Sequence, residues 1–245
     1  MNIETVFFDL GNTLVHNREL HHETIRKACR ALADECVNLG YMVDPAELAR
    51  RHFEGLIAYY EFREMDFIEL SADVVLRKTL HELGVTDVLE QDLIHMLRIF
   101  YEVTQQNWFL TPGALETLSA LKGNGLRIGL ISNASCEADV MQLLKKNDLE
   151  RFLDPIVISA RVGFRKPRAE IFACALEKAG SRKEAAVMIG DSLLSDIYGA
   201  GKYGMRTIWF KRYYPENKSD SMLFAPDQIA MSMEEIPVIL NDWKR

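Results

Sequence analysis

The sequence predicts an α/β fold: a Rossmann-like, doubly wound parallel sheet with an inserted all-helical cap domain. Short apolar runs alternate with segments of helical periodicity, which is typical of βαβ units and of a parallel sheet. Polar residues follow several of these runs directly, as at the ligand-binding edge of such a sheet. Residues 16–107 show helical periodicity and no convincing strand. We therefore assign residues 1–15 and 108–245 to the core and residues 16–107 to the cap.

The first apolar run, Thr5–Phe8, sets the position of the candidate site. It is typical of a strand that is buried on both faces, and it leads into Asp9. Gly11 and Asn12 follow closely, and these residue types most readily accept the left-handed backbone conformation of a sharp turn. Asp9 is therefore expected at the carboxyl end of a central strand, where open α/β sheets bind their ligands.

The remaining elements follow from apolar periodicity and from helix start and stop signals. Asp44-Pro45 is a favoured helix start, and Ser232 with Glu235 has the spacing of a capping box. In the cap, helices are expected from Leu20 toward Gly40, from Asp44, and over Leu56–Phe62, Phe67–Leu83 and Leu89–Tyr101. In the core, helices are expected over Ala114–Leu121, Cys136–Lys146, Pro167–Lys178, Leu193–Lys202 and after Ser232, and strands over Arg127–Ile131, Pro155–Ile158, Ala185–Ile189 and Arg206–Phe210.

Charge and cysteine content argue against several classes of protein. The formal net charge is −7, and residues 16–107 account for it, with 10 Lys/Arg against 17 Asp/Glu. An acidic surface argues against nucleic acid or an anionic membrane as a partner. The apolar runs are far shorter than the roughly 20 residues that cross a bilayer, and we expect no secretory signal. Four scattered cysteines without a C-x-x-C pair are typical of a reducing compartment, so we expect a cytoplasmic protein.

Polar residues gather at the expected carboxyl ends of four segments: Asp9 with Thr13, Ser132 with Asn133, Lys166, and Asp191 with Asp196. Taken singly, Ser132 could cap a helix, Lys166 could be a solvated lysine, and the two aspartates could decorate a helix N-terminus. Taken together, they fit phosphoryl transfer in which Asp9 attacks phosphorus. Because two anions do not approach each other unaided, we expect a Mg²⁺ ion at the site.

In this scheme, Asp191 ligates the metal ion directly, and Asp196 holds a ligand or its water. Ser132 and Lys166 hydrogen-bond and neutralise the phosphoryl oxygens, together with amides at a helix N-terminus.

With these motifs, the chain resembles the haloacid dehalogenase-like superfamily of hydrolases, in the group whose helical cap lies between the first and second motifs. Phe7–Leu14 resembles the nucleophile motif, Ile131–Asn133 the second motif, Gly163–Pro167 with Ile171–Phe172 the third, and Ile189–Ser192 through Asp196–Ala200 and Gly204–Met205 the fourth. The resemblance covers about residues 1–15 and 108–240, and only the topology of the cap. It implies a Mg²⁺-dependent phosphatase that acts on a small phosphorylated metabolite through an aspartyl-phosphate. The implied residues are Asp9, Ser132 and Lys166 for catalysis, Asp9, Gly11, Asp191 and Asp196 for the metal ion, and Gly11, Asn12, Thr13 and Asn133 for the phosphate.

Gly11 departs from the family pattern. The family's phosphatases usually place a second Asp two residues after the nucleophile, as general acid and base. Gly11 keeps the backbone carbonyl that contacts the metal ion in the family, so Mg²⁺ binding is expected to survive. It cannot supply acid–base help, which is worth roughly 10²–10⁴ in rate. His16 is the nearest titratable residue that could replace it, although a lone histidine near a loop is more often solvated.

Three other functions stay open at the level of sequence. A metal-independent 2-haloacid dehalogenase also uses an Asp nucleophile, but the family's dehalogenases commonly have an aromatic residue where Gly11 stands, and the Asp191/Asp196 pair favours the metal-dependent branch. Phosphonate cleavage in the family uses a cap lysine, and this cap holds only Lys27 and Lys78. Gly11 also fits a catalytically weak, phosphate-binding regulatory protein.

Substrate specificity must come from the cap. Tyr59, Tyr60, Phe62 and Arg63 lie together near an expected helix end, and Arg18 lies near the entry to the cap. A cap arginine could bind a substrate carboxylate or a second phosphate with two parallel hydrogen bonds. The alternative is that the aromatic residues form the cap core and the arginines are solvated.

Overall fold

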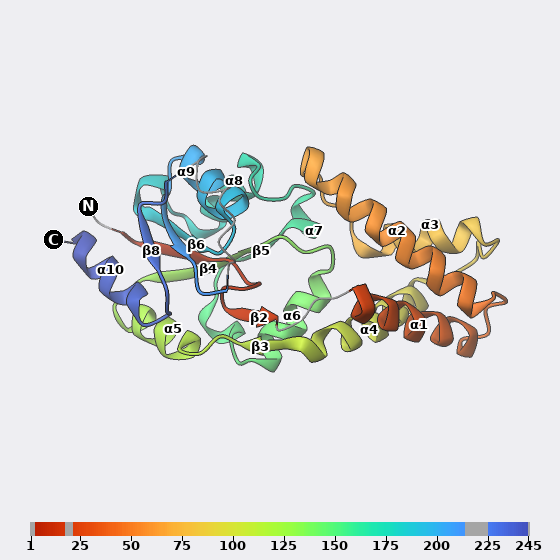
Figure 1. Cartoon of the computed structure of the whole chain (residues 1–245). Coiled ribbons are helices and arrows are strands. Elements are labelled where there is room, and N and C mark those ends of the chain that lie inside the picture. The colour runs from red at the N-terminus through yellow and green to blue at the C-terminus, as the bar shows by residue number, and fades with distance from the viewer. Residues whose placement is uncertain (1–2, 18–21, 214–224, 245) are drawn as a thin grey trace.

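The computed structural model describes residues 3–17, 22–213 and 225–244. Within these residues, six parallel strands form one sheet in the order β5-β4-β1-β6-β7-β8 (Figure 1). The sheet and its flanking helices confirm the predicted α/β, doubly wound fold. The strands are β1 (Thr5–Phe8), β4 (Arg127–Ser132), β5 (Ile156–Ile158), β6 (Ala186–Gly190), β7 (Arg206–Phe210) and β8 (Gln228–Ala230).

Alternate residues of β1 point to opposite faces of the sheet, as the period of a strand requires. Val6 and Phe8 pack against one layer, formed by α5 (Ala114–Gly123), α6 (Glu137–Lys146) and α10 (Glu235–Lys244). Phe7 packs against the other layer, where α8 (Ala169–Ala179) and α9 (Gly199–Tyr203) lie. All three side chains are fully buried, so the first strand is buried on both faces as predicted.

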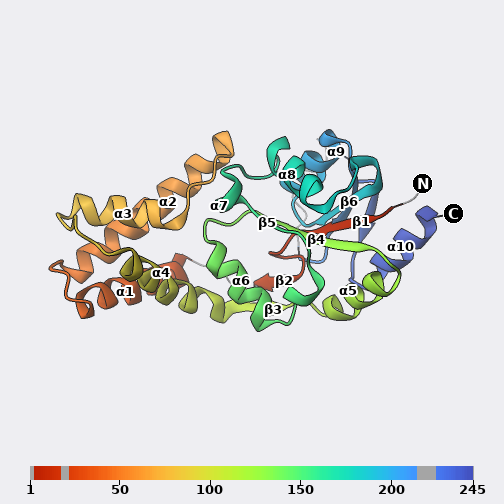
Figure 2. The same ribbon diagram turned by 180° about the vertical axis from the view of Figure 1, so that it is seen from behind.

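Four helices form a separate hydrophobic cluster at one end of the molecule, while β8 and α10 lie toward the other end (Figures 1 and 2). The four helices of this cluster are α1 (His22–Asn38), α2 (Pro45–Asp66), α3 (Ala72–Glu82) and α4 (Glu90–Thr104), and we call them the helical unit. The start of α2 is as predicted, because the Asp44 side chain accepts a hydrogen bond from the backbone of Ala46. We propose that the helical unit is the cap expected over residues 16–107.

The structure corrects several details of the predicted elements. Residues 67–71 do not continue a helix, because α2 runs through to Asp66 and α3 begins only at Ala72. A short antiparallel ribbon of β2 (Val15–Asn17) and β3 (Trp108–Leu110) joins the two chain segments that lead into and out of the helical unit. The helix expected over Leu193–Lys202 begins as a π-helical turn, η4 (Leu193–Tyr198). Strand β8 and the short helix α7 (Ser159–Val162) were not expected, because three or four residues carry too little periodicity.

Two further observations concern the state of the cysteines and the length of the apolar helices. The four cysteines, Cys29, Cys36, Cys136 and Cys174, are free thiols. Among the described residues, no helix combines the length and apolar character that crossing a bilayer requires.

Candidate active site

Three adjacent strands deliver the predicted polar residues to one edge of the sheet. Asp9 follows β1, Ser132 ends β4, and Asp191 follows β6. The strand order reverses at β1, since β4 and β5 lie on one side of it and β6, β7 and β8 on the other. The carboxyl ends of strands at such a switch point form the usual ligand site of an open α/β sheet.

Lys166 lies at the centre of this edge. Its side chain is 1% exposed, so it is not the solvated lysine that a lone lysine usually is. The ammonium Nζ lies 2.6 Å from Asp9 Oδ1 and 2.6 Å from Asp196 Oδ1, and it also donates to the backbone oxygen of Ile131 at 2.7 Å. Burial alone would lower the pKa of Lys166, but Asp196 and Asp9 raise it. Lys166 is therefore a cation that neutralises two carboxylates.

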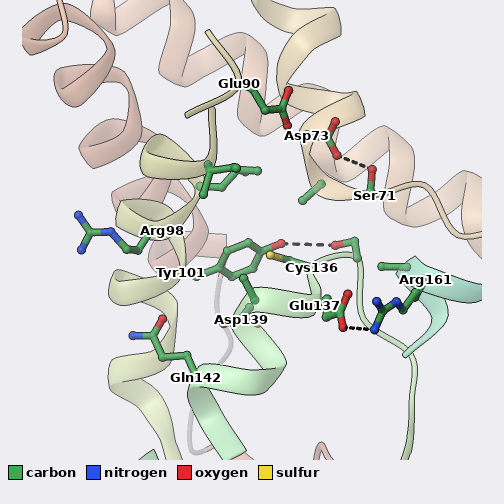
Figure 3. A pocket seen from close by; sticks show the side chains of 16 residues that line it. Ser71, Asp73, Glu90, Arg98, Tyr101, Cys136, Glu137, Asp139, Gln142 and Arg161 are labelled. Carbon is green, nitrogen blue, oxygen red and sulfur yellow. Dashed lines mark hydrogen bonds and ion pairs between the residues drawn. The ribbon is translucent and has the colours of Figure 1, made fainter. Parts of the chain in front are cut away.

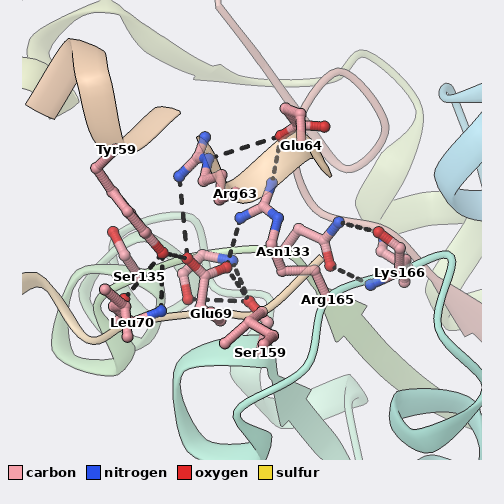
Figure 4. Close-up of polar contacts among 12 residues, drawn as sticks. Tyr59, Arg63, Glu64, Glu69, Leu70, Asn133, Ser135, Ser159, Arg165 and Lys166 are labelled. Atoms are coloured by element: carbon pink, nitrogen blue, oxygen red, sulfur yellow. Dashed lines mark hydrogen bonds and ion pairs between the residues drawn. The ribbon is translucent and has the colours of Figure 1, made fainter. Parts of the chain in front are cut away.

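Asn133, the residue directly after β4, fixes the backbone of Lys166. The Asn133 side chain donates to the carbonyl of Lys166 at 3.0 Å and accepts from its amide at 2.8 Å (Figure 4). This paired contact ties the end of β4 to the segment that carries the lysine. Asn133 thus has a structural contact that its predicted role in phosphate binding did not anticipate.

Asp9, Asp191 and Asp196 bring carboxylate oxygens within 4.8 Å of one another. Burial, and then the charges of Asp9 and Asp196, raise the pKa of Asp191 to about 8. Burial also raises the pKa of Asp9 to about 6, against the opposing effect of Lys166. When all are ionised, three carboxylates face a single ammonium group, and the all-oxygen donor set is the kind that Mg²⁺ prefers. The residues present fit a divalent cation.

The carboxylate of Asp196 is held tightly against the backbone. Its Oδ2 accepts a hydrogen bond from the amide of Ser192 at 3.0 Å. A Cβ on Gly190 would stand 2.2 Å from the same oxygen, so only glycine leaves room for this approach. The neighbouring Asp191 is anchored through its carbonyl, which accepts a hydrogen bond from the indole of Trp209 at 2.8 Å.

The turn after Asp9 has three residues that the sequence singled out. Asn12 has a φ of 53°, in the left-handed region that its type tolerates, and its side chain lowers the pKa of Asp191 against the larger effect of burial. Thr13 is fully buried, and its hydroxyl has no hydrogen-bond partner among the described residues. Gly11 packs under the ring of Trp108, which lies 3.3 Å from the point that a Cβ would occupy. The contact with Trp108 was not foreseen from the sequence.

A cavity of about 250 Å³ opens between this turn and the helical unit. The core contributes Gly11, Ser132 and Asn133 to its lining, and the helical unit contributes Tyr60 and Arg63. It therefore borders the Asp9 edge of the sheet directly. Its volume lies below the roughly 300–1,000 Å³ of sites for drug-sized ligands, so it suits a small molecule.

A larger cavity of about 390 Å³ lies beside it, between α3, α4 and the start of α6 (Figure 3). The hydroxyl of Tyr101 lies 3.4 Å from Ser135 Oγ, and both residues line both cavities. Of the predicted site residues, none lines the larger cavity. We therefore take the smaller cavity as the candidate substrate site.

The helical unit contacts the core beside Lys166 through a cluster that sequence reasoning missed. Glu69 is 4% exposed and accepts hydrogen bonds from Tyr59, from Ser159 at 2.6 Å and from Arg165 (Figure 4). Backbone bonds run beside it, from Glu69 N to Gly163 O at 3.0 Å and from Arg165 N to Phe67 O at 2.8 Å. We call residues 67–69 and 163–165 the docking strip. The one available signal was the acidic residue between Ile68 and Leu70, which breaks the expected helical pattern.

Other residues that the sequence singled out lie away from the site or outside the described residues. Lys27 and Lys78 are exposed and form ion pairs within their own helices, so the lysine expected for phosphonate cleavage is not in the cavity. His16 lies in β2, where its ring stacks on Tyr213 at a centroid distance of 4.5 Å. Phe62 is 52% exposed. Arg18 lies outside the described residues.

Comparisons with known proteins agree with this geometry. A sequence model described as haloacid dehalogenase-like hydrolase matches residues 3–204. A glyceraldehyde 3-phosphate phosphatase of Pyrococcus furiosus is 30% identical over 213 residues, which cover 85% of this chain and 81% of that protein. A ribulose-1,5-bisphosphate 5-phosphatase of Halopiger xanaduensis is 33% identical over 227 residues, or 88% of this chain and 87% of that protein.

A solved structure shows the same fold over nearly the whole chain. The 2-haloacid dehalogenase of Pseudomonas syringae pv. Tomato has a TM-score of 0.70 at 24% identity, covering 98% of this chain and 99% of that chain. The four motifs, the sheet topology and the family match lead to one conclusion. The chain belongs to the haloacid dehalogenase-like hydrolases.

Proposed function

We propose that this protein is a Mg²⁺-dependent phosphatase of small phosphorylated metabolites, with Asp9 as the nucleophile. The observation that carries the proposal is the position of Lys166 Nζ, 2.6 Å from both Asp9 and Asp196 at the carboxyl edge of the sheet. The phosphatase relatives act, by name, on glyceraldehyde 3-phosphate and ribulose-1,5-bisphosphate, and the cavity beside Gly11 is of a size for such metabolites.

In the proposed reaction, Asp9 attacks the phosphorus atom of the substrate, and the bond between phosphorus and the ester oxygen breaks. The phosphoryl group is transferred to the Asp9 carboxylate, and the ester oxygen leaves as an alkoxide that takes a proton from solvent water to become the alcohol. A water molecule then attacks the phosphorus of the aspartyl-phosphate, releases inorganic phosphate and restores Asp9. Lys166 and the Ser132 hydroxyl are placed to stabilise the negative charge on the phosphoryl oxygens.

Asp9, the carbonyl of Gly11, Asp191 and Asp196 are the proposed ligands of Mg²⁺. When bound, the ion would offset the repulsion between the Asp9 carboxylate and the incoming phosphate. The excess of acidic over basic groups in the cluster supports this proposal. It also favours the metal-dependent phosphatase over the dehalogenase alternative, whose reaction needs no metal ion.

Because Gly11 has no acidic side chain, the departing alcohol lacks the usual general acid. We therefore expect faster hydrolysis of phosphate esters with good leaving groups than of alkyl phosphates. This property distinguishes a working phosphatase of the proposed kind from a phosphate-binding regulatory protein, which binds without turnover.

The test is phosphate release from p-nitrophenyl phosphate by the purified protein, with Mg²⁺ and with a chelator. Release is expected with Mg²⁺ only, and the Asp9→Asn variant should lose it. Asp148→Asn is the matched control, because Asp148 is exposed, pairs with Arg151 and does not line the cavity. Activity that is equal in chelator, or that survives in Asp9→Asn, would contradict the proposal. Chloride release from 2-chloropropionate in chelator would favour the dehalogenase instead.

A further inference from the structure

We propose that Arg63 makes this enzyme selective for phosphate esters that carry a second anionic group, a carboxylate or another phosphate. This inference rests on the proposed phosphatase function and names its substrate class. It is carried by the position of the Arg63 guanidinium in the cavity, by its contacts and by the donors that these contacts leave unused.

Arg63 lies in the last turn of α2 and lines the same cavity as Gly11, Ser132 and Asn133. A substrate whose phosphate contacts the core residues therefore extends toward the helical unit, where Arg63 stands. Among the described residues that line this cavity, Arg63 is the one with a cationic side chain. The cavity thus has a phosphate end on the core and a separate positive charge on the helical unit.

The guanidinium is held in place without using its hydrogen bonds. Its Cζ lies 4.2 Å from the centroid of the Tyr60 ring and 5.6 Å from that of Tyr59. Stacking on aromatic faces orients the planar fork. The side chain is 20% exposed, and its Nε is buried without a hydrogen-bond partner among the described residues. A buried donor of this kind is costly unless a ligand satisfies it.

The acidic neighbours of Arg63 are occupied elsewhere. Glu69 approaches it only to 4.0 Å, and Glu69 already accepts hydrogen bonds from Tyr59, Ser159 and Arg165 (Figure 4). Glu64 approaches it to 3.6 Å but hydrogen-bonds Arg165 at 3.1 Å. Both distances exceed that of a hydrogen bond. The fork of Arg63 is therefore available to an incoming anion, and carboxylate and phosphate both match its geometry.

A carboxyl group of the chain also faces the cavity and must be compatible with this class of ligand. Burial raises the pKa of Asp139 to about 6, and its side chain accepts a hydrogen bond from Gln105 at 2.6 Å. Asp139 belongs to α6 and Gln105 follows α4, whereas Arg63 is on α2. The acid is thus bound to a donor on a different element and does not pair with Arg63.

The test compares two substrates that differ only in the second group. 3-Phosphoglycerate carries a carboxylate where glycerol 3-phosphate carries a hydroxymethyl group. The wild type should prefer 3-phosphoglycerate in kcat/KM by about tenfold or more, the range of hydrogen bonds to a charged group. Arg63→Gln should remove this preference by lowering kcat/KM for 3-phosphoglycerate while leaving that for glycerol 3-phosphate within about twofold. Arg63→Lys should fall between, and Arg51→Gln, on the exposed side of α2, should behave as wild type.

Two further measurements complete the test. One asks which kind of anion Arg63 prefers, and the other distinguishes a failure of this inference from a failure of the proposed phosphatase function. Ribulose 1,5-bisphosphate in place of 3-phosphoglycerate asks whether the second group is a phosphate. Calorimetry on the Asp9→Asn variant, with and without Arg63→Gln, measures the affinity for both test substrates in the absence of turnover. If the wild type does not hydrolyse p-nitrophenyl phosphate, the proposed phosphatase function is overturned. The calorimetric measurement then decides on the role of Arg63 by itself. Equal losses for both test substrates in Arg63→Gln, or no preference in the wild type, would overturn the inference.

Discussion

The indole ring of Trp108 lies 3.3 Å from the point at which a Cβ would stand on Gly11. Trp108 begins β3, the strand by which the chain returns from the helical unit to the core. The ring thus fills space next to the loop after Asp9, and a longer side chain at position 11 would need that space. The absence of the family's usual second Asp and the presence of Trp108 are therefore linked through packing.

This contact predicts that Gly11→Asp alone does not create a better enzyme. The new side chain must displace Trp108, and overpacking of this kind costs about 1–3 kcal/mol. We expect a lower unfolding temperature and no gain in the hydrolysis of alkyl phosphates.

Combining Gly11→Asp with Trp108→Ala should release the constraint. Relative to Trp108→Ala alone, the double variant should hydrolyse alkyl phosphates faster, by up to about 10²-fold. The matched control is Gly11→Asn with Trp108→Ala, which has the same bulk but no acid. A double variant that is no faster than this control would show that the Asp cannot reach the leaving group.

The Glu69 carboxylate predicts a large cost when its charge is removed. Arg165 is 5% exposed, and Glu69→Gln leaves its guanidinium without its buried carboxylate, at about 3–5 kcal/mol. Because Arg165 precedes Lys166, kcat should fall as well. Tyr59→Phe is the control, since it removes one hydrogen bond to Glu69 but keeps the charge, at about 1 kcal/mol. Denaturant unfolding measures both costs, and equal costs would contradict the role given to the charge.

The raised pKa of Asp191 leads us to expect that removing its charge increases stability but abolishes metal binding. Its pKa is raised to about 8, so its ionisation destabilises the folded protein increasingly as the pH rises from about 4 to 8. In chelator, Asp191→Asn should therefore unfold at a higher temperature than wild type at pH 8, and the difference should vanish near pH 4. Mg²⁺ is expected to raise the unfolding temperature of the wild type, and the same variant should lose this rise. A variant that is less stable than wild type in chelator at pH 8 would contradict the prediction.

His52 predicts an acid-sensitive helical unit. It is 1% exposed, its Nδ1 has no partner among the described residues, and burial lowers its pKa to about 4. His52 binds a proton near pH 6.5 in the unfolded chain but only near pH 4 in the folded protein. The free energy of unfolding therefore decreases as the pH falls through this window. The loss approaches about 3 kcal/mol at its lower end.

The measurement is the unfolding temperature against pH for wild type, His52→Leu and His81→Gln. His52→Leu should lose less stability than wild type between pH 7 and pH 4.5. His81 is exposed, so His81→Gln should follow the wild type. Parallel curves for wild type and His52→Leu would place the acid sensitivity elsewhere.

The sequence predicted the sheet and the convergence of the acidic residues because both follow from local patterns. Each strand of the core is a short apolar run, and Asp9, Ser132 and Asp191 follow from strand ends alone. Parallel strands bring those ends to one edge whatever the loops do. Lys166 was also expected at a strand end, but the structure places it in the loop between α7 and α8, which reaches the same edge of the sheet.

The contacts between the two units could not be predicted in the same way. Trp108 over Gly11, and Glu69 with Ser159 and Arg165, join residues that lie about a hundred positions apart. Such pairs leave no periodic signal, since each residue alone fits a surface or a core equally well. The helix expected over Phe67–Leu83 forms only from Ala72 onward, because residues 67–71 form backbone hydrogen bonds with the core that outweigh helical propensity.

The docking strip limits how freely the helical unit can be exchanged by recombination. Phe67 and Glu69 share backbone hydrogen bonds with the stretch that ends one residue before Lys166, the proposed catalytic lysine. A chimera that received a relative's insertion would therefore exchange part of the scaffold under its own active site. Modular transplantation would have to move residues 163–165 together with the donor domain.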